Sequence, residues 1–398
     1  MAFEISIGGV IANQKEQAAG MEGRRRRPGM RALLGGSALA GSLMMGMMLA
    51  TPEVAEAACG FSSVTSTYSS NVNIVNGDAC TAGQLYYGGS VSPAIITMTG
   101  GTLTIVDWID LGDSKYSNTY GTLNASGGTT LISGGTLYVG YRGTGVFTIY
   151  DGASIASNIT IGYSIDSVTT VGTMNIGAAA GEAAGSAPGA ISSGTIALSN
   201  SSLSTATLVF NHDGTEADPF TLSSLIKTGS ASGNSNILHI AGYTKYTGDG
   251  SGYAGNLTVY GGTLEVTDSL GAKALVVGDN TYGSGSGALT LDGGTMTVAT
   301  TLVTGNTASS AGDITVKNGG KLVVSGIDAG TSTAAIALAG ATGTTSSVTV
   351  DGAGSTFDMT VDTGRTNLAI GGAGAATVVI SAGGSVKGDG QILIGNGP

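Results

Sequence analysis

The chain repeats a step of two glycines, a small or polar residue and an apolar residue. The step occurs at Gly100–Leu103, Gly134–Leu137, Gly261–Leu264, Gly293–Met296, Gly319–Leu322 and Gly383–Val386. Repetition of one short unit is typical of a solenoid, in which each unit packs on the copies before and after it. The step therefore predicts a stack of short β units.

Around these glycines the apolar residues alternate along the chain, as in strands with one buried face. The pairs are Leu103 with Ile105, Leu137 with Val139, Leu264 with Val266, Met296 with Val298 and Leu322 with Val324 after the glycines, and Phe147 with Ile149, Leu257 with Val259, Leu289 with Leu291 and Ile314 with Val316 before them. Each glycine pair then lies between two strands, at a corner where glycine tolerates positive φ and close backbone approach.

A second step, apolar-x-apolar-Gly, indicates the length of the unit. It occurs at Ile109–Gly112, Leu137–Gly140, Ile159–Gly162, Leu275–Gly278, Leu368–Gly371 and Ile392–Gly395. The interval is 28 residues from Gly112 to Gly140 and 22 from Gly140 to Gly162. One turn of a parallel β-helix uses a comparable number, whereas the strands of a sandwich recur about every 8–12 residues. We therefore predict an all-β, parallel β-helical solenoid with a core of Val, Ile and Leu.

Composition separates this prediction from a disordered chain. Glycine supplies 70 of 398 residues and charged residues only 10%, while the apolar fraction stays at 41%. The excess of glycine would favour disorder if the alternating apolar runs were absent. A solenoid grows in one dimension, so a chain of this length can remain one unit.

The first 57 residues resemble an extended leader with a signal peptide. Arg24–Arg27 and Arg31 precede an apolar stretch over 32–50, and Ala55-Glu56-Ala57 fits the small-x-small pattern of signal-peptidase sites. We predict cleavage after Ala57. An uncleaved membrane anchor and a lipoprotein attached through Cys59 are the alternatives, and either Met21 or Met30 could be the true start.

Removal of the leader leaves 21 of the 26 acidic and 9 of the 15 basic residues, a net charge of −12. No basic patch remains, so nucleic-acid binding is not expected. Cys59 and Cys80 are the only cysteines, and in an exported chain they predict a disulfide that closes an N-terminal loop. Two cysteines and two distant histidines do not make a metal site.

One part of the chain resembles a known repeat. Its segments are Leu225–Gly229, Leu238–Gly242, Tyr246–Gly248 and Leu257–Leu264, with further similar units over Leu275–Gly294 and Leu368–Gly384. In this order they resemble the autotransporter-associated β-strand repeat of Gram-negative type V secretion proteins. Together the matches touch most of residues 97–397.

This resemblance implies a right-handed β-helical passenger, exported through the inner membrane and carried to the cell surface by an outer-membrane β-barrel translocator. No barrel-like succession of strands follows in this chain. The expectation is a truncated reading frame, or a passenger whose translocator is a separate chain. The predicted organisation is a leader over 1–57, an N-terminal cap over 58–96 and solenoid repeats over 97–398, with an irregular insert over 163–204.

The candidate catalytic motifs are few. Asp362–Leu368 resembles the loop of aspartic proteases, and 328–332 is a poorer copy, but both are expected to be surface turns. A serine nucleophile has only His212 and His239 as bases, and His239 is expected to face solvent between Leu238 and Ile240. His212 lies in an acidic loop, where a metal site is the alternative reading. Neither a catalytic residue nor a cofactor is predicted.

Tyr243, Tyr246, Tyr253 and Tyr260 gather in a glycine-rich region and form the predicted ligand-contact loop. Tyrosines there could stack on sugars or anchor a protein contact, and the alternative is a set of ordinary strand tyrosines. The leading hypothesis is a structural or adhesive surface passenger without catalytic activity, with a host-cell, bacterial or matrix ligand. The alternatives are a β-helical polysaccharide-degrading enzyme and a truncated, non-functional passenger fragment.

Overall fold

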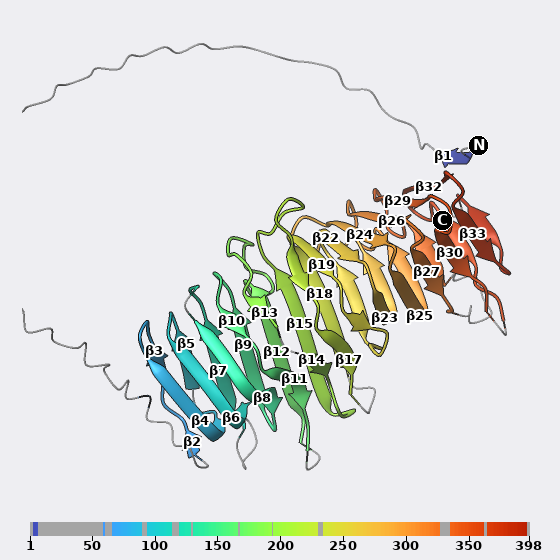
Figure 1. Ribbon diagram of the computed structural model, residues 1–398. Coiled ribbons are helices and arrows are strands. Elements are labelled where there is room, and N and C mark those ends of the chain that lie inside the picture. Colours follow the sequence, from blue (N-terminus) through green and yellow to red (C-terminus); the bar gives the residue numbers. More distant parts are fainter. Residues whose placement is uncertain are drawn as a thin grey trace, which may run out of the picture. The chain divides into compact units, whose positions relative to one another are not determined.

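The computed structural model describes residues 3–6, 59, 66–89, 94–113, 119–128, 130–165, 168–192, 194–229, 234–326, 335–361 and 364–395. The regular structure of these residues consists of β-strands. None of them belongs to a helix able to cross a membrane. Almost every strand pair is parallel, and Figure 1 shows the strands stacked as successive turns. The predicted parallel β-solenoid is confirmed.

The strands form three sheets that run along the stack. Sheet A contains β16 (Phe220–Leu222), β19 (Tyr243–Tyr246), β22 (Gly262–Val266), β24 (Ser286–Asp292), β26 (Ala311–Lys317), β29 (Thr345–Asp351), β32 (Ala375–Ser381) and β1 (Phe3–Ser6). Sheet B contains β2 (Ser66–Tyr68), β4 (Ala79–Tyr87), β6 (Thr102–Leu111), β8 (Leu131–Tyr141), β10 (Ser154–Ile155), β11 (Asn158–Tyr163), β13 (Ala190–Ile191), β14 (Thr195–Leu198) and β17 (Leu225–Thr228).

Sheet C is the longest. It contains β3 (Val72–Ile74), β5 (Ala94–Met98), β7 (Tyr120–Ala125), β9 (Thr144–Ile149), β12 (Thr170–Gly177), β15 (Ser204–Asn211), β18 (Asn234–Ala241), β20 (Asp249–Gly250), β21 (Asn256–Val259), β23 (Ser269–Val277), β25 (Thr295–Thr304), β27 (Lys321–Val324), β28 (Ile336–Leu338), β30 (Thr356–Met359), β31 (Leu368–Ile370), β33 (Ser385–Gly388) and β34 (Ile392–Ile394).

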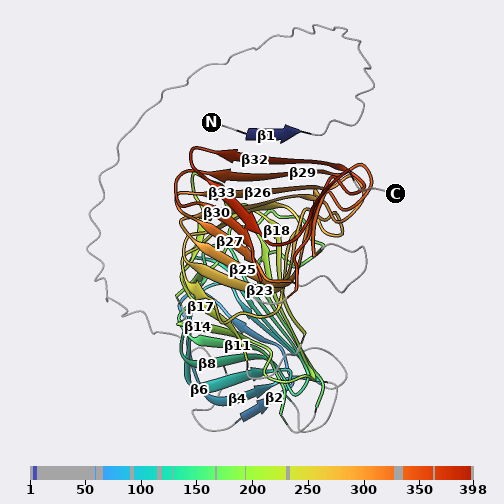
Figure 2. The ribbon, with the colours of Figure 1, turned by 90° about the vertical axis from the view of Figure 1, so that its right-hand side faces the viewer.

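The register between turns explains the glycine intervals of the sequence. Leu111 of β6 pairs with Val139 of β8, and Val139 pairs with Ile161 of β11. These offsets of 28 and 22 residues equal the intervals between Gly112, Gly140 and Gly162. Figure 2 shows β6, β8, β11 and β14 stacked one above another. The second glycine step therefore marks the same corner in successive turns.

The core follows the predicted alternation. All nine apolar pairs named from the sequence are buried, each side chain at most 3% exposed. Burial of one such side chain contributes about 1.5–3 kcal/mol. The apolar ladder is thus the main source of stability, and each turn adds its own share.

Two predicted domain boundaries are corrected by these strands. The solenoid begins inside the predicted cap over 58–96, because β3 pairs with β5 and β4 pairs with β6. Within the predicted irregular insert over 163–204, β12 pairs with both β9 and β15, so only 178–189 lacks regular strands. Alternate buried residues such as Met174 and Ile176 hold this alanine- and glycine-rich segment in register.

One strand falls within the predicted leader: β1 pairs antiparallel with β32 along its free edge. The remainder of the leader, including the predicted cleavage site after Ala57, lies outside the described residues. So does the aspartic-protease-like segment 328–332, together with Asp362 and Thr363 of the second such loop.

We expect Gly140→Ala to destabilise the solenoid by about 2 kcal/mol or more, because alanine disfavours positive φ and has a Cβ. Gly140 has φ of 79°, and a Cβ there would lie 2.3 Å from the carbonyl oxygen of Val171. Gly128→Ala is the matched control, since a Cβ at Gly128 meets no atom within 4 Å. Urea unfolding of both variants checks this prediction, and equal midpoints would contradict it.

Candidate functional site

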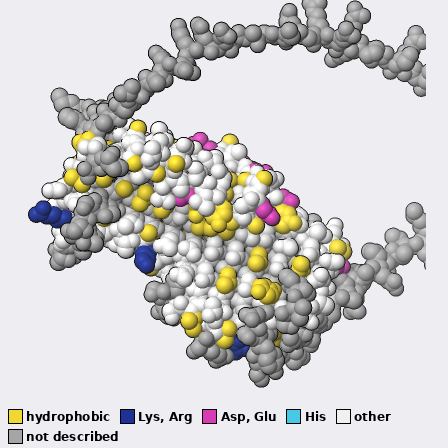
Figure 3. All heavy atoms as spheres, turned by 180° about the vertical axis from the view of Figure 1, so that it is seen from behind, with side chains coloured by type: hydrophobic (Ala, Val, Ile, Leu, Met, Phe, Trp, Pro, Cys, Tyr) yellow, Lys and Arg dark blue, Asp and Glu magenta, His cyan; other side chains and the backbone are white. Residues whose placement is uncertain are grey.

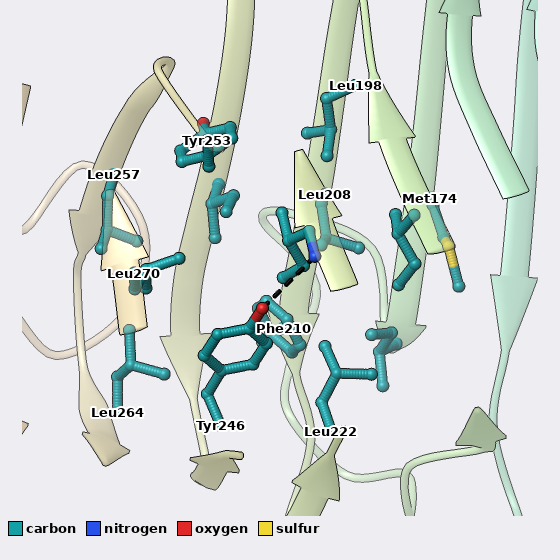
Figure 4. Close-up of a cluster of buried hydrophobic side chains, with 14 of the residues drawn as sticks. Met174, Leu198, Leu208, Phe210, Leu222, Tyr246, Tyr253, Leu257, Leu264 and Leu270 are labelled. Carbon is teal, nitrogen blue, oxygen red and sulfur yellow. Dashed lines mark hydrogen bonds between the residues drawn. The ribbon is translucent and has the colours of Figure 1, made fainter. Parts of the chain in front are cut away.

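Two of the four predicted ligand-contact tyrosines lie in the core. Tyr246 and Tyr253 are each 2% exposed, and Figure 4 shows both among the buried side chains. The Tyr246 hydroxyl accepts a hydrogen bond from the Ile226 amide at 3.3 Å and donates to the Ser224 carbonyl at 3.2 Å. Tyr253 donates to the Asn256 carbonyl at 2.7 Å. The prediction that these two tyrosines contact a ligand is wrong.

The other two tyrosines are half-buried and are engaged separately. The Tyr243 hydroxyl donates to Glu265, whose other carboxylate oxygen lies 2.8 Å from Lys245 Nζ. The Tyr260 ring packs edge-on against Tyr282, with the ring centres 5.0 Å apart. The sequence cluster Tyr243–Tyr260 is therefore not one surface, because strand alternation sends its members to different sides of the sheet.

His239 is fully buried, so the expectation that it faces solvent is wrong. Its strand β18 turns Ile237 and His239 inward and Leu238 outward. The register of β15 with β18 stacks His239 on Phe210, in the core. The sequence pattern Leu-His-Ile suggested the opposite phase.

The two histidines share one hydroxyl. The Gly214 amide donates to His212 Nδ1 at 3.1 Å, so neutral His212 carries its proton on Nε2, which lies 2.9 Å from Thr244 Oγ1. His239 Nδ1 lies 2.9 Å from the Gly261 carbonyl and donates to it, which leaves Nε2 to accept from Thr244 Oγ1 at 3.1 Å. Every ring nitrogen is thus engaged, and burial lowers the pKa of each histidine to about 4.

These bonds leave no ring nitrogen of His212 for a metal. Among the described residues, no group of three or more His, Cys, Asp and Glu side chains could hold a metal ion. Cys59 and Cys80 form a disulfide, with their Cα atoms 5.9 Å apart.

The most reactive set of side chains lies elsewhere, on the outer face of sheet B. The apolar-x-apolar-Gly steps of β6, β8 and β11 are stacked, so the x residues become neighbours: Asp110 pairs with Tyr138, and Tyr138 with Thr160. Beyond the glycines, Tyr141 pairs with Tyr163. We call Asp110, Asp113, Tyr138, Tyr141, Arg142 and Tyr163 the tyrosine–carboxylate cluster.

The three tyrosine rings of this cluster contact one another. Tyr141 and Tyr163 are stacked, with centres 5.4 Å apart and planes 3° apart. Tyr138 lies 5.0 Å from the centre of Tyr163 and 5.5 Å from that of Tyr141. The Arg142 guanidinium lies 5.1 Å from the centre of the Tyr141 ring, a cation–π distance. The rings form one half-exposed aromatic platform.

Two carboxyl groups lie buried beside this platform. Asp110 is 1% and Asp113 3% exposed, and Arg142 Nη1 lies 3.7 Å from Asp113 Oδ1, an ion-pair distance too long for a hydrogen bond. Oδ1 of each aspartate has no hydrogen-bond partner among the described residues. Such burial is costly for a charged carboxylate.

Burial raises the pKa of Asp110 to about 8, and the Asp113 charge raises it further while Arg142 opposes the shift. Burial also raises the pKa of Asp113 to about 6, again opposed by Arg142. At neutral pH Asp110 is therefore largely protonated, and Asp113 is the charged partner of Arg142.

The arrangement suits binding better than catalysis. A carboxyl that transfers a proton has to reach the substrate, and both carboxyls are almost wholly buried. The tyrosines and Arg142 are the partly exposed members. Tyrosine rings present an apolar face and a polar tip, which is the chemistry of sugar and protein contacts.

The sequence prediction missed this cluster, although the signal was present. Arg142 was read as an isolated base, far in sequence from other charges. Alignment of Ile109–Gly112, Leu137–Gly140 and Ile159–Gly162 as stacked turns would have placed Asp110 beside Tyr138 and Tyr141 beside Tyr163. The aspartate pair is local, because Asp110 and Asp113 flank Gly112.

Comparison with known proteins gives one distant relative. A stretch of 201 residues, 50% of this chain, is 31% identical to the uncharacterized lipoprotein YdeK of Escherichia coli (strain K12). The match spans 14% of the relative's length. No family model matches the chain, and no solved structure matches it.

Proposed function

We propose that the protein is an exported, cell-surface passenger of the autotransporter type, with an adhesive role and no catalytic activity. The observation that carries the proposal is the half-exposed aromatic platform of Tyr138, Tyr141 and Tyr163 on the outer face of a solenoid. Its partner is a host-cell, bacterial or matrix surface that presents carbohydrate. An outer-membrane translocator on another chain would deliver it.

Two further observations support this proposal. The relative YdeK is named a lipoprotein, which is consistent with a location in the cell envelope. Figure 3 shows a face with few Lys, Arg, Asp and Glu side chains, so attraction by charge contributes little on that face. Contacts through aromatic rings and hydroxyl groups then remain as the source of affinity.

The proposal predicts that Tyr163→Ala weakens binding to glycan arrays and epithelial cells at least about tenfold, because aromatic anchors carry most of the energy of such contacts. Tyr120→Ala is the control, since Tyr120 is 44% exposed but belongs to sheet C. Wild type and the control are expected to bind alike. Absence of wild-type binding above a surface-scrambled protein would contradict the adhesive role.

A polysaccharide-degrading enzyme is the second candidate, favoured by the proximity of Asp110, Asp113 and Arg142. Paired carboxyls with different pKa values are the groups that glycoside hydrolysis uses. A reducing-end assay on acidic polysaccharides separates the two functions. Release of reducing ends that is lost in Asp113→Asn would establish the enzyme, and no release is expected from the adhesive passenger.

A further inference from the structure

A second polar site lies on a different sheet from the tyrosine–carboxylate cluster. A cavity of about 390 Å³ is lined by Asn124, Thr148, Tyr150, Asn175 and Glu182, together with nearby small residues. Its volume falls within the range of small-molecule sites, about 300–1,000 Å³. β7, β9 and β12 of sheet C form one side of the cavity, and the segment 178–186 forms the other.

The strand side of the cavity carries a row of hydrogen-bonding side chains on successive turns. Asn124 pairs with Thr148, and Thr148 pairs with Asn175. Asn175 Nδ2 donates to Thr148 Oγ1 at 3.1 Å. Three neighbouring turns therefore present amide, hydroxyl and amide groups at intervals of about 4.8 Å.

Asn175 marks where a ligand would bind. Its side chain lines the cavity and the residue is 2% exposed, yet Oδ1 has no hydrogen-bond partner among the described residues. An unsatisfied buried acceptor costs about 1–3 kcal/mol. A hydroxyl group of a ligand in the cavity would donate to this oxygen and remove the cost.

The opposite wall is held in place before any ligand binds. Asn211 Nδ2 donates to the carbonyls of Ala179 at 2.8 Å and Glu182 at 3.0 Å. The Ala179 amide donates to Glu182 Oε2 at 3.2 Å, and the Asp151 amide donates to the Ala187 carbonyl at 2.8 Å. A wall tied at these points lowers the entropic cost of binding.

We propose that this cavity binds a neutral pyranose sugar. None of the described lining residues is Lys or Arg, and Glu182 adds a negative charge, so phosphates and uronic acids are disfavoured. Amides and hydroxyls match the donors and acceptors of sugar hydroxyl groups, and Tyr150 adds an aromatic ring. The site lies on sheet C and does not depend on the proposed adhesive role of sheet B.

The test is titration of the full chain with glucose, galactose, mannose and N-acetylglucosamine, followed by NMR of alanine methyl groups. Saturable shifts are expected for the methyls of Ala178 and Ala179, which line the cavity. Glucuronate is expected to bind more weakly than glucose. If none of the four neutral sugars shifts these methyls, the proposal is overturned.

Asn175→Ala is expected to weaken sugar binding at least tenfold. The matched control is Asn236→Ala, which removes an amide of the same sheet that bonds to Asn256 of the next turn, outside the cavity. The control should bind like wild type. Unchanged affinity in Asn175→Ala would overturn the proposal. If that variant fails to fold, the wild-type methyl shifts decide alone.

Discussion

Acidification from pH 6.5 to pH 4 is expected to destabilise the solenoid through His212 and His239. Each has a pKa of about 4 when folded, lowered by burial from 6.5. Between these values the unfolded chain binds a proton that the folded chain does not, so stability falls as pH falls. Each histidine contributes up to about 1.4 kcal/mol per pH unit.

The two buried aspartates act in the opposite direction over part of this range, so the histidine effect is isolated by variants. His239→Gln removes one of the two histidines of the chain, and the slope of unfolding free energy against pH should fall by about 1.4 kcal/mol per unit relative to wild type. Thr244→Val is the control, because it removes the shared hydroxyl and keeps both histidines. It should lower stability at pH 7 and retain the slope.

Urea unfolding at half-unit steps from pH 4 to pH 7.5 measures these slopes. Identical slopes for wild type and His239→Gln would show that His239 titrates alike in the folded and unfolded states. That result would contradict its place in the core.

Asp110→Asn is expected to stabilise the protein relative to wild type, by a margin that grows as pH rises from 4 to 8. The folded pKa of Asp110 is about 8, raised by burial from 3.8. Between these values the unfolded chain releases a proton that the folded chain retains, so wild type loses up to about 1.4 kcal/mol per pH unit. Asparagine has no proton to lose and escapes this loss.

Asp107→Asn is the matched control, because Asp107 lies exposed on the same strand β6. Its difference from wild type should be nearly constant from pH 5 to pH 8. Unfolding of the three proteins in urea at each pH gives the comparison. A constant difference for Asp110→Asn as well would show that Asp110 ionises freely in the folded state.

The repeat architecture was predictable because it follows from local rules. Period-two alternation placed Leu103 and Ile105 in the core, and glycine intervals gave the length of a turn between Gly112 and Gly162. These signals need only neighbours in sequence. The phase of β18 was not predictable in the same way, because Leu238, His239 and Ile240 offer two apolar faces and the register with β15 decides between them.

The candidate sites needed information from other turns. Tyr246 and Tyr253 looked like loop tyrosines in a glycine-rich segment, but their hydroxyls find backbone partners inside the core. Conversely, Asp110 and Tyr163 are far apart in sequence and meet only because 22- and 28-residue turns bring their steps into register. Sequence spacing alone therefore located the wrong tyrosines.

The central claim is that the stacked register of β8 and β11 assembles the tyrosine–carboxylate cluster. Tyr141 and Tyr163 are direct partners in that register. Partner residues on neighbouring strands lie about 4.8 Å apart, within the Cα spacing of about 4.4–6.8 Å that disulfides require. Tyr141→Cys combined with Tyr163→Cys should therefore form a disulfide under oxidising conditions, as shown by peptide mapping with mass spectrometry. Tyr141→Cys with Thr160→Cys is out of register and should remain as two thiols, and cross-linking of this second pair in place of the first would contradict the account.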